Sequence, residues 1–162
     1  MQQIIEKILV YIDGSEQSIT AAQYALSLAG STGASLTALY VVNTRALDDL
    51  VKASIFLATE QEEYAHDIEA DAGRYLNLVK EMAVKKGITV ATECRKGSIH
   101  QEIIAAAKEH DIDLLVIGEL SRVRSRRDEF YNDSERAMRL SNCSVLIVKD
   151  EERVNDFFED MV

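Results

Sequence analysis

The residues of this chain that could take part in chemistry lie near the ends of its predicted strands. Asp13 directly follows the apolar run at residues 7–12, where a carboxylate could contact a ligand hydroxyl or a metal ion. It also precedes Gly14 and Ser15, a pair typical of turns, so it could instead shape the turn or cap the next helix. Both interpretations of Asp13 stay open at this point.

Four arginines lie within six residues of an otherwise acidic chain, at Arg122, Arg124, Arg126 and Arg127. Their guanidinium groups match phosphate and carboxylate geometry, so the segment is a possible anion-binding site. The alternative is ion pairing with Asp128, Glu129, the acidic C-terminus or a partner chain. We favour ion pairing, because charged runs of this kind are usually solvated or paired.

Other catalytic signals are weak, and we predict no catalytic residue and no metal site. The chain has no G-x-S-x-G nucleophile turn, no G-x-G-x-x-G and no phosphate-binding G-x-x-x-x-G-K-[ST] motif. His66, His100 and His110 fall within predicted helices, and we interpret them as surface residues. Cys94 and Cys143 lack a metal or redox spacing and are interpreted as reduced core thiols.

Composition excludes several classes of protein. The 162 residues suit one globular domain, with 47% hydrophobic and 28% charged residues. Eighteen basic and 28 acidic residues give a net charge of −10, which disfavours binding to nucleic acid or to an anionic membrane. No apolar run approaches the roughly 18 to 20 residues of a membrane helix. The N-terminus does not resemble a signal peptide, so we expect a cytoplasmic protein.

The elements that would position these residues alternate along the chain. We expect strands at 7–12, 35–42, 88–94, 113–118 and 144–148, and helices at 16–32, 60–86, 98–110 and 132–140. Ser98 and Gln101 have the spacing of a capping box. The pattern predicts a doubly wound, Rossmann-like α/β fold: a five-stranded, mainly parallel sheet with helices on both faces. We expect one domain at 1–149 and an acidic tail at 150–162.

Five segments, in this order, resemble the universal stress protein family. Residues 8–16 resemble its first strand and D-G-S turn, and residues 39–42 resemble its second strand. Residues 97–103 resemble the G-x-x-x-E-x-I turn, residues 113–118 the D-L-I-V-M-G strand, and residues 144–148 the closing strand. The likeness covers about residues 7–149.

ATP-binding members of that family carry G-x2-G-x9-G-[ST] after the fourth strand. Counted from Gly118, the second glycine is replaced by Ser121, and the final pair is Tyr131-Asn132. Glycines there let backbone N–H groups approach phosphates, and only the first is present. By resemblance, any nucleotide would contact Asp13, Val41, Gly118, Ser121 and Asn132.

The resemblance implies a non-catalytic, cytoplasmic stress-response regulator that forms a homodimer through its fifth strand. We expect no cofactor, no ATP, and protein clients of unknown identity. Val145, Ile147, Phe157 and Phe158 are the predicted dimer-interface residues. Alternatives are a sensor that binds ATP or AMP through a modified phosphate loop, a hydrolase of adenine nucleotides, and a protein-interaction module.

Overall fold

A computed structural model describes residues 2–44, 48, 52, 58–120 and 133–161. Within those residues, five strands form one sheet in the order β3-β2-β1-β4-β5, and every neighbouring pair is parallel. The strands are β1 (Lys7–Ile12), β2 (Ser35–Asn43), β3 (Ala91–Gly97), β4 (Leu114–Gly118) and β5 (Ser144–Val148). The helices are α1 (Glu16–Thr32), α3 (Ala58–Lys85), α4 (Ile99–Glu109), α6 (Asp133–Leu140) and α7 (Glu151–Asp160). The predicted fold class is confirmed.

Helix α1 shows why local signals in the sequence were sufficient for much of the fold. Ser15 is its N-cap, and the Ser15 hydroxyl accepts a hydrogen bond from the Ser18 N–H at 3.1 Å. Gly33 ends the helix in the left-handed conformation, with φ of 77°. A serine at the start and a glycine just past the end are the preferred residues for these positions.

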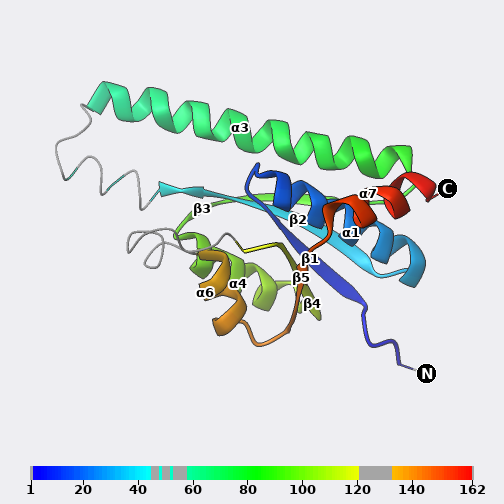
Figure 1. Cartoon of the computed structure of the whole chain (residues 1–162). Helices are drawn as coiled ribbons and strands as arrows, with labels where there is room; N and C mark the ends of the chain where they lie inside the picture. The colour runs from blue at the N-terminus through cyan, green and yellow to red at the C-terminus, as the bar shows by residue number, and fades with distance from the viewer. Residues whose placement is uncertain (1, 45–47, 49–51, 53–57, 121–132, 162) are drawn as a thin grey trace.

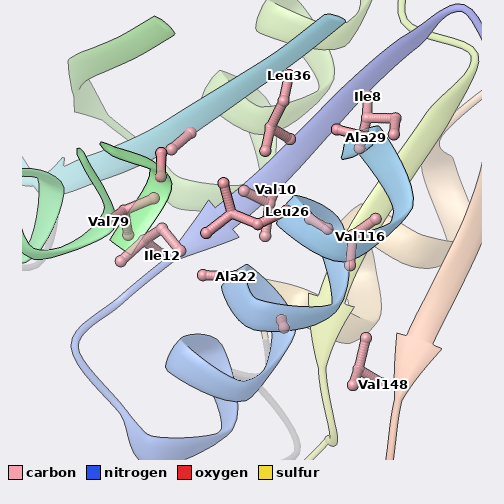
Figure 2. Packing of buried hydrophobic residues seen from close by; sticks show 14 of the residues in the cluster. Ile8, Val10, Ile12, Ala22, Leu26, Ala29, Leu36, Val79, Val116 and Val148 are labelled. Atoms are coloured by element: carbon pink, nitrogen blue, oxygen red, sulfur yellow. The ribbon is translucent and has the colours of Figure 1, made fainter. Parts of the chain in front are cut away.

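The sheet is covered on both faces (Figure 1). Helices α1, α3 and α7 lie on one face, and α4 and α6 lie on the other. Side chains of β1 alternate between the two layers: Ile8, Val10 and Ile12 pack toward α1, whereas Leu9 and Tyr11 pack toward α4 and α6. Figure 2 shows the first layer, where Leu26 of α1 lies over the central strands.

Two local expectations were wrong. The third strand begins at Ala91, three residues later than predicted, because Ile88 and Val90 pack against the α1 layer in the connection before the strand. Strand β3 is also an edge strand with no fully buried residue. The capping box at α4 does not form, since Ser98 makes no side-chain cap hydrogen bond.

The C-terminal segment is a helix rather than only an acidic tail. Helix α7 packs on α1 and contributes Val154, 1% exposed, and Phe158, 8% exposed, to the main core. Lys86, next to the end of α3, donates hydrogen bonds to the carbonyl oxygens of Glu159 at 2.9 Å and Met161 at 2.8 Å. Helix α7 is therefore part of the packed unit. None of the described helices is long and apolar enough to cross a membrane.

Candidate functional site

The strand order places the candidate site at the carboxyl ends of β1 and β4. Chain connections leave β1 in one direction toward β2 and β3, and β4 lies on its other side with β5. Ligands of open parallel sheets bind outside the strand ends at such a reversal point. Asp13 follows β1, Gly118 ends β4, and the N-termini of α4 and α6 cover the same face of the sheet.

Asp13 shapes the turn after β1. Its Oδ1 atom accepts hydrogen bonds from the Ser15 backbone N–H at 2.9 Å and the Ser15 hydroxyl at 2.5 Å. The same serine caps α1, so the carboxylate orients the residue that starts the helix. Of the two interpretations left open by the sequence, the structure displays the turn-forming one.

Glycines at both strand ends are required by close packing. A Cβ atom on Gly118 would lie 2.5 Å from the carbonyl oxygen of Gln17, in the first turn of α1. Gly14 has φ of +85°, and a Cβ atom there would lie 2.6 Å from the ring of Tyr75 on α3. Gly118 therefore has a structural reason to be glycine that involves no phosphate: it lets α1 approach β4.

The remaining predicted nucleotide residues divide into one that the structure places and two that it does not. The Val41 side chain is 4% exposed and packs in the layer under α4 and α6. Ser121 and Asn132 lie outside the described residues. The same holds for the predicted anion-binding arginines Arg122, Arg124, Arg126 and Arg127.

A polar pair that sequence reasoning missed connects α4 and α6. The side chain of His100 is only 13% exposed, and its Nδ1 atom lies 3.1 Å from Oδ1 of Asp133. The interpretation of His100 as a surface residue was therefore wrong, whereas His66 and His110 are exposed. Only the packing of two helices far apart in sequence brings the pair together, so no local spacing could have indicated it.

Tyr11, on β1, belongs to the buried cluster that includes Ala137 of α6 and packs against Ile99 of α4. It is 5% exposed. Burial, followed by the negative charges of Asp13 and Asp133, raises the pKa of the Tyr11 phenol far above its ordinary value. The hydroxyl is therefore neutral at physiological pH and is able to donate a hydrogen bond.

The predicted dimer-interface residues do not form one patch. Val145 and Ile147 pack against the layer under α4 and α6, whereas Phe157 and Phe158 belong to the opposite layer. The Phe157 ring meets Tyr24 of α1 edge-on, with centroids 5.5 Å apart, and Phe158 is buried. We therefore correct the assignment of Phe158, because its ring already packs inside its own chain.

The two cysteines and the acidic residues show no further chemistry. Both cysteines are free, and Cys94 is exposed, so only Cys143, partly buried, fits the prediction of a packed thiol. Among the described residues, no group of three histidine, cysteine, aspartate or glutamate side chains could hold a metal ion.

Comparisons with known proteins agree on one family. The universal stress protein family matches residues 5–149. A universal stress protein of Methanocaldococcus jannaschii is 29% identical over 149 residues, covering 91% of this chain and 84% of that protein. Universal stress protein YxiE of Bacillus subtilis is 29% identical over 148 residues, covering 90% of this chain and 100% of that protein.

Solved structures show the same fold. Universal stress protein UspA from Lactobacillus plantarum superposes with a TM-score of 0.71 at 24% identity, covering 91% of this chain and 100% of that chain. A universal stress protein in complex with cAMP gives a TM-score of 0.68 at 20% identity, covering 91% and 99% of the two chains. A family protein from Arabidopsis thaliana with AMP bound gives 0.64 at 16% identity, covering 91% and 94%.

Proposed function

We propose, from the premise that this chain belongs to the universal stress protein family, that it is a non-catalytic regulator of the stress response that does not hold ATP. In this proposal the protein is cytoplasmic and homodimeric, and it acts on protein clients rather than on a substrate. The stress-response role is supported by two curated universal stress proteins whose alignments cover 91% and 90% of this chain.

One observation supports the absence of ATP binding most strongly. Gly118 is the only glycine after Gly97, and the hydrogen in place of its Cβ is needed for the approach of the Gln17 carbonyl. A phosphate-binding loop after β4 would therefore contain no glycine besides Gly118, and the contact with Gln17 already explains why that residue is glycine. The ATP triphosphate would meet side chains instead of backbone N–H groups, in a protein of net charge −10.

A thermal-shift titration with ATP and Mg²⁺ tests this proposal. A ligand at about 100 times its Kd should stabilise the folded protein by about 2.7 kcal/mol. We expect no shift at millimolar ATP beyond the shift caused by the same concentration of Mg²⁺ and an inert salt. A saturating, ATP-dependent rise in Tm would contradict the proposal.

A nucleotide sensor is the second candidate function. Fold neighbours solved with AMP and cAMP favour it, as do the four arginines at 122–127, which could supply phosphate contacts without glycine. The variant Arg124→Gln with Arg126→Gln separates the two candidates. Stabilisation by AMP that this double variant abolishes would support the sensor, whereas an equal absence of response in both proteins supports the regulator without nucleotide.

A further inference from the structure

Helix α7 is an addition to the family domain. The family match ends at residue 149, and α7 begins at Glu151. Asp150 lies between them with a φ of 58°, an uncommon value for a residue other than glycine, and its Oδ1 atom accepts a hydrogen bond from the Arg153 N–H at 3.2 Å. Helix α7 is therefore a separate helical segment that a short connection joins to β5, and it lies along α1 (Figure 1).

The apolar side of α7 is seated on α1 as a bound helix is seated in a groove. Val154 and Phe158, four residues apart, lie on one side of α7 and are buried in the core layer that contains α1. The Phe157 ring lies beside them and meets the Tyr24 ring edge-on. Anchors at i, i+3 and i+4 are the usual pattern of amphipathic-helix recognition. The α1 surface thus accepts a short helix with large apolar side chains at these spacings.

A lysine of the domain caps the C-terminal end of the seated helix. The Lys86 ammonium group donates hydrogen bonds to the carbonyl oxygens of Glu159 and Met161, and it lies 5.1 Å from the centroid of the Phe158 ring. A cation stabilises the C-terminus of a helix of any sequence, because the last carbonyl groups lack partners within the helix. This contact would serve a helix from another protein as well as it serves α7.

The N-terminal end of α7 matches its surroundings poorly. A hollow of about 620 Å³ is lined by Glu16 of α1 and by Glu151 and Glu152 of α7, and none of the described residues that line it is basic. Like charges around one hollow repel one another. A helix with a basic side chain at the position of Glu152 would instead be attracted by Glu16.

Helix α7 also leaves part of the neighbouring surface uncovered. A second hollow, of about 740 Å³, lies beside its last turn, where Leu28 and Ile88 form apolar walls next to Met161. A longer helix seated on α1 could cover these walls. Helix α7 has only ten residues, and isolated helices shorter than about 12 residues are marginal in water.

We propose that the α1 surface is a docking groove for an amphipathic helix of a partner protein, and that α7 occupies this groove as a displaceable substitute. The partner helix carries large apolar residues at i, i+3 and i+4 and a basic residue in its first turn. The inference rests on the proposed function and deepens it, because it states the chemistry by which a protein client is recognised. The client helix replaces α7, gains an attraction to Glu16 and keeps the cap from Lys86.

The test measures binding of a fluorescent peptide with the sequence of residues 149–161 to the full-length chain by fluorescence anisotropy. The variant Phe158→Ala loosens α7 and frees the groove, so it should bind the peptide about tenfold more tightly than wild type, in which the groove is filled. A peptide that itself carries Phe158→Ala should not bind. A peptide that carries Glu152→Lys should bind about threefold more tightly than the unchanged peptide.

Ile103→Ala is the matched control for a loosened protein. Ile103 is fully buried in the opposite layer, so its truncation destabilises the chain to a similar degree without touching α7. We expect this variant to bind the peptide no better than wild type. If Phe158→Ala does not fold, Lys86→Met, which removes the cap and keeps the apolar contacts, takes its place.

Equal affinity of wild type and the loosened variant for the peptide would overturn the inference, as would equally tight binding to Ile103→Ala. A Glu152→Lys peptide that binds no better than the unchanged one would refute the basic residue assigned to the partner. Failure of the proposed function is distinct, because it appears as ATP binding by the wild type, whereas the peptide is measured without nucleotide.

Discussion

Gly118 illustrates how one residue can be required by packing at a place where a ligand is expected. Its missing side chain admits the carbonyl group of Gln17, which is backbone and cannot rotate away. We predict that Gly118→Ala lowers the free energy of unfolding by about 1–3 kcal/mol, the usual cost of overpacking a core. Urea unfolding measures it.

Gly73→Ala is the matched control for that variant. Gly73 lies within α3, and a Cβ atom there meets nothing within 4 Å. Alanine is the better helix former by about 1 kcal/mol, so this variant should gain stability. Equal effects of the two substitutions would contradict the packing account of Gly118.

Arg95 of the edge strand β3 pairs with three carboxylates on the α4 side of the sheet, more than any other described side chain. It is 14% exposed, its Nε atom lies 2.6 Å from Glu93, and it also contacts Glu102 and Glu109. We predict that Arg95→Met destabilises the protein at pH 7 by about 1–3 kcal/mol, because three carboxylates lose their shared donor.

The same cluster predicts a pH dependence. Burial acts to raise the pKa of Glu93, but hydrogen bonds and charges from His110 and Arg95 outweigh it, so this pKa lies below its ordinary value of 4.5. A lowered pKa stabilises the fold above that ordinary value, and the stabilisation is lost as pH falls below it. The free energy of unfolding, measured from pH 7 to pH 3, should therefore decrease less steeply with falling pH in Arg95→Met than in wild type. A steeper loss would refute this assignment.

Individual residues were predictable from the sequence where their partners are local. Asp13, Gly14 and Ser15 follow one another, and they build the turn that their types suggested. His100 and Asp133 are 33 positions apart, so their contact depends on how two helices cross the sheet. Local pattern carries no information about such a contact.

At the scale of elements, α7 is the segment whose role the sequence least revealed. Two of its ten residues, Val154 and Phe158, are buried, and its surface is acidic. Such a helix is held by its contact with α1 rather than by its own propensity. Strands and helices with capping residues or long apolar stripes, such as β1 and α1, were predicted almost to the residue.

This account predicts unequal effects of two adjacent substitutions in α7. Phe158→Ala should cost about 3–5 kcal/mol, as for other buried phenylalanines, because its ring packs in the core and under the Lys86 ammonium at 5.1 Å. Phe157→Ala should cost clearly less, since that ring is partly exposed. Chemical denaturation of both variants provides the measurement, and a smaller loss for Phe158→Ala would be inconsistent with the packing described.

At the scale of the whole molecule, the sheet has one edge suited to self-association. Strand β5 pairs only with β4 among the described strands, and it carries no charged residue. We predict sedimentation at twice the chain mass of 18.1 kDa and dissociation in Val145→Glu. Gly73→Ala in α3, which packs on β2 and β3 rather than on β5, should remain dimeric. A wild-type monomer at micromolar concentration would rule out the homodimer.

The overall architecture followed from the sequence because alternating strands and helices allow few topologies. The candidate site was less predictable from the sequence, because it depends on close contacts between elements, such as the contact of Gly118 with the Gln17 carbonyl group.

The central claim is that this family member does not retain ATP, and the nucleotide content of the purified protein tests it most directly. Protein isolated without added nucleotide is denatured in acid, and the released material is separated by ion-exchange chromatography and quantified against protein. We predict an adenine-nucleotide content far below one molecule per wild-type chain. A content near one ATP per wild-type chain would contradict the account.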